Sequence, residues 1–291
     1  MTWMVTGANG QLGKALTREL ESQDIDFVAF NSKQLDITDS HIVNECVGSI
    51  KPDVIINAAA WTDVDGAETE SDAALAVNGF GVENLASAAA ALGAILVHIS
   101  TDYVFSGDSN KPWAVDSQLN PQGEYGRSKA AGELAIQKSH ARRSYVVRTA
   151  WLYSEFGKNF AKTMCNLATS SDKEVRVVND QIGQPTNAND LAVLLIKLAQ
   201  SNAEFGVYHG TNSGQASWFD FAQEIFMLSG ADVKRVIPVP SSEYPRPAKR
   251  PAYSVLSHDS WRNTGISPMQ GWKAALEESM PAILDSVKMQ R

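Results

Sequence analysis

The sequence has few cysteines, no long apolar run and no excess of positive charge. Its 291 residues include two cysteines, Cys46 and Cys165, which are too few for a disulfide framework or a cysteine-rich metal site. No stretch approaches the ~18 uninterrupted apolar residues of a membrane span. The net charge of -8 disfavours a nucleic-acid or anionic-membrane surface as the main partner. These absences indicate a soluble cytoplasmic protein that binds neither nucleic acid nor membranes.

The first half of the chain alternates short apolar runs with helical segments. Strands that are apolar on both faces are typical of a parallel sheet covered by helices. The expected strands are Trp3–Thr6, Asp26–Phe30, Val54–Ala58, Ala94–Ser100 and Tyr145–Arg148, and the expected helices are Gln11–Ser22, Asp39–Ile50, Ser71–Leu92 and Tyr125–His140. The pattern predicts an α/β fold with a Rossmann-type, doubly wound parallel sheet.

After residue 150 this regular alternation is lost, and strands, helices and Pro-rich loops such as YPRPAKRP are mixed. The expected strands are Glu174–Val178, Gly206–His209 and Arg235–Val239, and the expected helices are Asn189–Ser201, Ser217–Ser229 and Trp272–Val287. We predict a dinucleotide-binding domain over residues 1–150 and a smaller α/β substrate-binding lobe over residues 151–291, with some later segments crossing back to the sheet.

Three glycines, Gly7, Gly10 and Gly13, lie between the first strand and the first helix. Glycines in such a turn allow positive φ, close approach of the backbone to a pyrophosphate and close packing of the helix. The helix N-terminus also offers unpaired N–H groups to the phosphates. The alternative is a tight strand-to-helix turn without a ligand. The order of strand, loop and helix favours a dinucleotide site, and the glycine spacing indicates the short-chain dehydrogenase variety. The expected contacts of this loop also include Asn9, Gln11 and Leu12.

The second strand is followed by Asn31, Ser32 and Lys33, where an NAD site normally places a carboxylate. Asparagine does not repel a 2′-phosphate, and Lys33 attracts one, so we expect NADPH with NADH also accepted. The alternative is that Lys33 is a solvated loop residue. The other expected cofactor contacts are Asp36, Ile37, Ala58, Ala59, Ala60 and Ile99.

Tyr125 and Lys129 are four residues apart and therefore share one face of the expected helix. An ammonium group beside a phenol favours the phenolate and lowers its pKa, and the same ammonium group can bind the cofactor ribose. Thr101, at the end of the fourth strand, can hydrogen-bond a substrate oxygen. A lone Tyr-x-x-x-Lys is usually a surface pair, but its place after this strand and the phosphate loop indicates an acid, its tuning cation and an orienting hydroxyl.

Motifs along the whole chain resemble those of the dTDP-4-dehydrorhamnose reductases, a family of extended short-chain dehydrogenases/reductases. They are TGANGQLG, NAAAWTDVDGAE, STDYVFSG, EYGRSKAAGE, RTAWLY, GKNF, VVNDQIGQPT and AKRP. The resemblance implies reduction of the C4 ketone of dTDP-4-dehydro-L-rhamnose by NADPH or NADH, which gives dTDP-L-rhamnose. It assigns catalysis to Thr101, Tyr125 and Lys129.

The resemblance also implies a set of substrate contacts. Asp102 and Trp151 are expected at the sugar, and the indole of Trp151 is alternatively an ordinary core aromatic. Lys249 and Arg250 are expected at the nucleotide part, because a guanidinium suits a phosphate, although they are alternatively a solvated basic turn. The remaining expected contacts are Thr62, Val64, Asn159 and Phe160.

Two departures from related patterns narrow the function. Sugar-nucleotide dehydratases follow their threonine with Asp-Glu, whereas this chain has Asp102 and Tyr103, so elimination lacks its base and reduction is favoured. Some members of the resembled family form dimers bridged by Mg²⁺ on glutamates. The corresponding stretches here carry Lys14, Ala15, Asn189 and Asp190, which disfavour a hard cation. We expect no metal site and a monomer or weak homodimer.

Two other functions remain open at this stage. One is a non-catalytic regulatory subunit that resembles the β subunit of methionine adenosyltransferase, which shares this branch of the superfamily. The other is a reductase or epimerase of a different nucleotide sugar. An intact set of threonine, tyrosine and lysine favours an enzyme.

Overall fold

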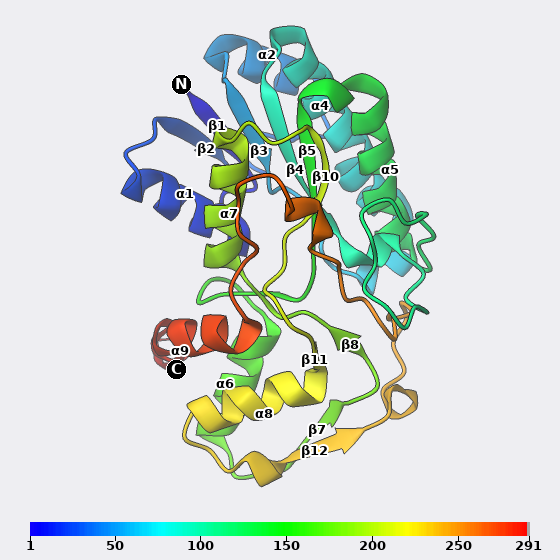
Figure 1. Ribbon diagram of the computed structural model, residues 1–291, viewed down its shortest axis with the longest axis vertical. Helices are drawn as coiled ribbons and strands as arrows, with labels where there is room; N and C mark the ends of the chain where they lie inside the picture. The colour runs from blue at the N-terminus through cyan, green and yellow to red at the C-terminus, as the bar shows by residue number, and fades with distance from the viewer. Residues whose placement is uncertain (290–291) are drawn as a thin grey trace.

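A six-stranded parallel sheet forms the upper half of the molecule in Figure 1, with helices on both faces. The structure is a computed structural model that describes residues 1–289. Across the sheet the strands are β10 (Gly206–His209), β5 (Ser144–Thr149), β4 (Ile95–Thr101), β3 (Val54–Asn57), β1 (Trp3–Thr6) and β2 (Phe27–Phe30). The strand order reverses between β1 and β3, and doubly wound folds bind ligands at such a switch point. The predicted fold class is confirmed.

Alternate residues of the central strands face opposite layers of helices. One layer contains α1 (Gln11–Ser22) and α7 (Ala188–Gln200), and the other contains α2 (Ser40–Ile50), α4 (Gly81–Leu92) and α5 (Glu124–Ser139). In β1, Val5 packs with the first layer and Met4 with the second, and both are fully buried. Burial on both faces explains why these strands are continuous apolar runs in the sequence.

The single helix expected over residues 71–92 is divided into three parts. These are α3 (Ser71–Leu75), a π-helical turn η2 (Ala76–Phe80) and α4. The π-turn contains the buried Asn78, whose side chain accepts a hydrogen bond from the Trp61 backbone N–H and donates to Ser128 Oγ. The irregular turn thus connects the segment after β3 to α5, as π-turns often do near functional sites.

The lower half of the molecule in Figure 1 has its own apolar core, which includes Phe221, Phe226 and Trp272. Its helices are α6 (Phe160–Ser170), α8 (Trp218–Leu228) and α9 (Trp272–Lys288). Short strands pair around them: β7 (Val175–Val178) with β12 (Val236–Val239), β8 (Ile182–Gly183) with β11 (Ala216–Ser217), and β6 (Leu152–Tyr153) with β9 (Thr186–Asn187). The short 3₁₀ helices are η1 (Gly66–Glu68), η3 (Asp102–Val104), η4 (Ala141–Arg143), η5 (Val233–Arg235), η6 (Ser241–Glu243) and η7 (Asp259–Trp261). Among residues 1–289, no helix is both long and apolar enough to cross a membrane.

A buried ion pair fixes α5 against the carboxyl ends of β4 and β5. Arg148 Nη2 lies 2.7 Å from Glu133 Oε2, and the two side chains are 4% and 6% exposed. Arg148 Nε also donates to Glu133 Oε1 at 2.9 Å, and Ser100 Oγ donates to the same oxygen. Each charge is therefore paired and hydrogen-bonded, as a buried charge requires.

Replacing Arg148 by Met should leave the Glu133 carboxylate buried without its partner. We expect the free energy of unfolding, measured by urea denaturation, to fall by ~3–5 kcal/mol. Adding Glu133→Gln removes the unpaired charge and should recover part of this loss. As a control, Arg127→Met breaks the exposed Arg127–Glu124 pair and should cost less than about 1 kcal/mol. An equal, small effect in both single variants would contradict the role given to the buried pair.

Candidate active site

The loop after β1 is pressed against the chain that leaves β3. Gly7 has φ +71°, and a Cβ atom at this position would lie 2.6 Å from the backbone carbonyl carbon of Ala58. A Cβ on Gly13 would lie 2.2 Å from the Gly7 carbonyl oxygen. Gly10 begins α1 as its N-cap, and no side chain caps the helix. The N–H groups of the first turn therefore suit a phosphate, and the loop fits the pyrophosphate of a dinucleotide.

The other predicted contacts in this loop have different surroundings. Asn9 is exposed, whereas Leu12 is 5% exposed and belongs to the core. Gln11 is half-buried, and its Oε1 accepts hydrogen bonds from Asn159 Nδ2 at 2.8 Å and from Ser154 Oγ at 3.1 Å. The structure thus joins a predicted cofactor contact, Gln11, to a predicted substrate contact, Asn159.

The segment after β2 forms a local turn with exposed side chains. Asn31 Oδ1 accepts a hydrogen bond from the Lys33 backbone N–H at 2.9 Å, and Ser32 and Lys33 are exposed. Asp36 Oδ1 accepts from the backbone N–H and the hydroxyl of Thr38, so that carboxylate stabilises its own turn. Ile37 is buried. Lys33 is consequently the cation that this turn offers to a ligand.

Thr101 and Tyr125 meet beyond the carboxyl end of β4. Thr101 ends the strand, accepts a hydrogen bond from the Tyr103 N–H at 3.2 Å and donates to Asp102 Oδ1 at 3.0 Å. Tyr125 lies in the first turn of α5, and its ring meets that of Tyr103 edge-on with the centroids 5.6 Å apart. Burial raises the pKa of Tyr125 to about 12, although the Thr101 hydrogen bond lowers it.

This pKa differs from the sequence-based expectation that Lys129 lowers it. Lys129 is 2% exposed, and its Nζ donates to the carbonyl oxygen of Ile99 at 2.6 Å and lies 3.4 Å from His98 Nε2. Burial lowers the pKa of Lys129 to about 8, against the opposing charge of Glu133. Desolvation thus dominates for both groups and favours their neutral forms.

Asp102 is a buried carboxylate with an open position. Its side chain is 2% exposed, and within the described chain Oδ2 has no hydrogen-bond partner. Burial raises the pKa of Asp102 to about 6, while nearby Ser254 and Thr101 lower it. The Ser254 hydroxyl is itself buried and without a partner of hydrogen-bond geometry. Two unsatisfied polar groups side by side indicate a ligand position. The sequence analysis did not select Ser254. Its position shortly after the AKRP motif is the one feature of the sequence that could have indicated it.

Trp151 is half-buried and stacked on Trp218, with ring centroids 3.5 Å apart and planes 8° from parallel. Trp151 has φ +46°, and the buried Gly183 leaves the room that its indole occupies. Phe160 packs against Trp218 at 4.7 Å, and Asn159 caps α6 by accepting a hydrogen bond from the Lys162 N–H. Trp218, which the sequence analysis did not single out, is therefore the aromatic centre of this cluster.

Arg250 is held by an acidic residue of the segment after β3. Its Nη2 lies 2.9 Å from Asp65 Oδ2, and Asp65 Oδ1 accepts from the Ala248 N–H at 3.2 Å. Arg250 and the exposed Lys249 line a small pocket together with Tyr103, which places both cations next to the Thr101–Tyr125 cluster.

Of the other predicted contacts on the Asp65 segment, Thr62 is exposed and Val64 is half-buried. Ala58, Ala59, Ala60 and Ile99 are half-buried near the switch point.

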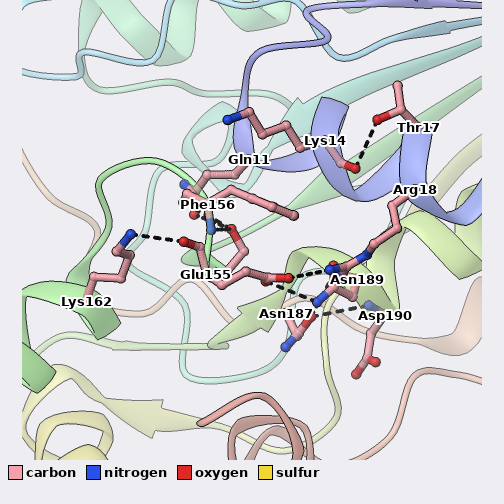
Figure 2. Close-up of polar contacts among 11 residues, drawn as sticks. Gln11, Lys14, Thr17, Arg18, Glu155, Phe156, Lys162, Asn187, Asn189 and Asp190 are labelled. Atoms are coloured by element: carbon pink, nitrogen blue, oxygen red, sulfur yellow. Dashed lines mark hydrogen bonds and ion pairs between the residues drawn. The ribbon is translucent and has the colours of Figure 1, made fainter. Parts of the chain in front are cut away.

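The positions considered for a metal bridge carry a lysine, an alanine, an asparagine and an aspartate. Figure 2 shows Arg18 between Glu155 and Asn189, and Arg18 donates to Glu155 Oε1 and Asn189 Oδ1 at 2.6 Å each. Lys14 lies over the Phe156 ring, and Asp190 accepts a hydrogen bond from Asn212. Ala15 is buried in the core. In residues 1–289, no three or more His, Cys, Asp or Glu side chains are grouped to hold a metal ion.

A glycine loop at the switch point, together with a Tyr–Lys helix packed on β4 and β5, is typical of Rossmann-type oxidoreductases of the extended short-chain dehydrogenase/reductase class. A family model described as the RmlD substrate binding domain matches residues 1–284. The chain therefore belongs to the RmlD family, whose members are NADP-binding oxidoreductases of dTDP-sugar biosynthesis.

Relatives of similar identity carry names for different sugars. The chain is 45% identical over 285 residues to a dTDP-4-dehydrorhamnose reductase of Streptomyces griseus, covering 97% of this chain and 93% of that protein. It is 43% identical over 281 residues to a dTDP-4-keto-6-deoxy-D-glucose reductase of Streptomyces niveus, covering 97% of both. The crystal structure of a Bacillus anthracis dTDP-4-dehydrorhamnose reductase with NADP matches with a TM-score of 0.92 at 42% identity, covering 96% of this chain and 98% of that one.

The raised pKa of Asp102 predicts a pH-dependent cost to stability. The folded pKa lies above the unfolded value, so folding favours the protonated form, and stability is lost as pH rises from about 4 through about 6. Asp102→Asn should therefore raise the free energy of unfolding by ~2–3 kcal/mol above this window and change it little below pH 4. Urea denaturation over this pH range measures the difference.

The exposed Asp285 provides the control for this measurement, because Asp285→Asn removes a surface carboxylate and should change the free energy of unfolding by less than about 1 kcal/mol. If Asp102→Asn raises the free energy of unfolding by the same amount at low and high pH, ionisation of Asp102 does not destabilise the folded protein.

Proposed function

We propose that the protein reduces the C4 ketone of dTDP-4-dehydro-L-rhamnose to dTDP-L-rhamnose, with NADPH preferred and NADH accepted, as the final step of dTDP-rhamnose biosynthesis. The observation that supports this proposal is that Thr101 ends β4 and that Tyr125 and Lys129 lie on α5, which packs against that strand, in a chain 45% identical over nearly its whole length to a reductase of that name. We expect it to act in the cytoplasm as a monomer or weak homodimer.

Tyr125 is suited to give a proton to the substrate oxygen. Because its pKa is raised to about 12, the phenol keeps its proton at neutral pH until a stronger base forms nearby. When NADPH is bound, it supplies the hydride for the reduction. As the ketone is reduced, its oxygen gains negative charge and becomes such a base. The Thr101 hydroxyl, which donates to Asp102 Oδ1 in the structure, would turn its proton toward the same oxygen to orient it, and Lys129 would hold the ribose hydroxyls.

The unsatisfied polar groups around Thr101 suit a sugar. Asp102 Oδ2 and Ser254 Oγ can each hydrogen-bond a sugar hydroxyl, which would satisfy two buried groups at once. The guanidinium of Arg250, oriented by Asp65, suits the diphosphate, and the stacked Trp151 and Trp218 suit the flat parts of the ligand. Tyr103 stands where a dehydratase has its glutamate, which supports reduction over elimination.

A second candidate substrate is dTDP-4-keto-6-deoxy-D-glucose, because the Streptomyces niveus relative named for it is 43% identical over the same length. The experiment that decides is NADPH oxidation with each of the two dTDP-4-keto sugars, prepared enzymatically. A higher kcat/KM for dTDP-4-dehydro-L-rhamnose supports the proposal, and a reversed preference supports the second candidate. No oxidation with either sugar contradicts the reductase assignment and favours a regulatory role.

Tyr125→Phe removes the proposed acid but keeps the ring. Ketone reduction should fall by ~10²–10⁴-fold, the usual loss for a general acid, while NADPH binding measured by cofactor fluorescence is retained. The matched control is Tyr208→Phe, whose hydroxyl donates to the Glu204 carbonyl oxygen outside the site and whose loss should leave turnover near that of the unchanged protein. Near-normal turnover by Tyr125→Phe would sink the acid assignment.

Lys33→Glu tests whether the turn after β2 binds the 2′-phosphate of NADPH. The new carboxylate should repel that phosphate, so the ratio of kcat/KM with NADPH to kcat/KM with NADH should fall at least about tenfold, or ~1.4 kcal/mol. Lys138→Glu, an exposed charge reversal in the last turn of α5, should leave the ratio unchanged. If Lys33→Glu also leaves it unchanged, Lys33 is a solvated residue that does not select the cofactor.

A further inference from the structure

Three buried polar residues form a row across the sheet directly beneath Lys129. Thr6 on β1 is in register with Asn57 on β3, which is in register with His98 on β4, and each is at most 1% exposed. The neighbouring residues of these strands are apolar. A polar row in such a core is costly unless every group is hydrogen-bonded, so the direction of each hydrogen bond can be worked out.

The backbone N–H of Ala59 sets the direction of the whole row. It donates to Asn57 Oδ1 at 3.1 Å, and Thr6 Oγ1 donates to the same oxygen at 2.7 Å. A backbone N–H can only donate, so the oxygen of Asn57 must face Ala59 and its amide nitrogen must face the ring of His98. The distance from Asn57 Nδ2 to His98 Nδ1 is 3.1 Å, so Nδ1 accepts a hydrogen bond.

His98 therefore carries its proton on the nitrogen that faces Lys129. Burial, together with the charge of Lys129, lowers the pKa of His98 well below its ordinary value, so the ring is neutral and has one proton. Since Nδ1 accepts, that proton is on Nε2, 3.4 Å from Lys129 Nζ. An Nε2–H group cannot accept from an ammonium group, but it can donate to a neutral amine.

The other neighbours of Lys129 do not offset this donor. The Ile99 carbonyl oxygen accepts one hydrogen bond from Nζ at 2.6 Å. Glu133, from its own helix, is the charge that raises the pKa of Lys129, and the His98 ring on β4 is the titratable group that lies against its Nζ. Glu133 favours the ammonium form but is already paired with Arg148. One face of the ammonium group thus meets the positive end of an N–H bond.

We propose that His98 is a positioning residue for Lys129: its Nε2–H, directed through Asn57 by the backbone N–H of Ala59, favours the neutral amine and makes Lys129 easier to deprotonate. The proposal rests on the proposed function only in that Lys129 holds the ribose of the cofactor.

The test is the pH dependence of NADPH binding, measured by cofactor fluorescence without any sugar substrate. Affinity should fall as Lys129 loses its proton near pH 8. His98→Leu removes the N–H group that faces the ammonium group, so the inflection should move upward by at least about one pH unit, a tenfold lower acid dissociation constant. In His98→Gln the amide oxygen accepts from Asn57 and the amide N–H again faces Lys129, so the inflection should stay in place. Lys129→Met should abolish the inflection.

The matched control is His140→Leu, because His140 is also buried but its Nε2 meets the Ala94 carbonyl oxygen away from Lys129. It should leave the inflection in place. An inflection that does not move in folded His98→Leu, or that persists in Lys129→Met, overturns the proposal. A merely structural role of His98 would lower stability without moving the inflection.

A second measurement uses the unchanged protein and keeps the proposal testable if His98→Leu does not fold. Long-range ¹⁵N–¹H spectra of histidine-labelled protein at neutral pH should show His98 protonated on Nε2 and unprotonated on Nδ1. The opposite tautomer overturns the proposal. Neither measurement involves ketone reduction, so failure to reduce a dTDP-sugar would contradict the proposed function and leave this result standing.

Discussion

The docking of α5 on the carboxyl ends of β4 and β5 is the constraint on which the site depends. One face of this helix carries Tyr125, Lys129 and Glu133 at intervals of four residues, so their positions are fixed together. Glu133 is paired with Arg148, Lys129 donates to the β4 backbone, and Tyr125 is brought to Thr101. Close contact is possible because α5 has glycines where it meets other chain segments. A Cβ on Gly126 would lie 2.3 Å from the Tyr103 carbonyl oxygen, and one on Gly132 would lie 2.3 Å from that of Asn78.

The same docking excludes water from ionisable side chains whose charged forms are stabilised by water. Lys129, Asp102 and Tyr125 all have pKa values moved toward their neutral forms by burial. At neutral pH the shifts of Lys129 and Asp102 cost folding free energy, which the two apolar layers around the sheet offset. Buried, incompletely satisfied groups are common where a protein must bind or react, since a preorganised site is rarely the most stable arrangement.

Local patterns in the sequence were sufficient to predict most of the sheet. The apolar runs of β1, β3 and β4 and the glycines at 7, 10 and 13 are contiguous, and each depends on neighbours in the chain. The division of the helix over residues 71–92 could not be predicted, because its π-turn depends on Asn78 contacting Trp61 and Ser128, which are distant in sequence.

The residues of the candidate site that belong to a sequence motif could be predicted, and the other residues could not. Ser254 and Trp218 lie in no recognisable pattern, and their importance comes from side chains that arrive from other elements. The pKa of Tyr125 was expected to fall because sequence shows the spacing to Lys129 but not the depth of burial, which here has the larger effect. Spacing identifies which groups meet, whereas desolvation depends on everything packed around them.

The contact between Gln11 and Asn159 links the two halves of the protein at one atom. Gln11 belongs to the first turn of α1, and Asn159 is the N-cap of α6 in the other half. Because one amide oxygen receives the Asn159 side chain while the Asn159 oxygen caps α6, the two helix starts form a single hydrogen-bonded unit. A shift of the phosphate loop would therefore have to break or carry with it the hydrogen bond to Asn159 at the start of α6.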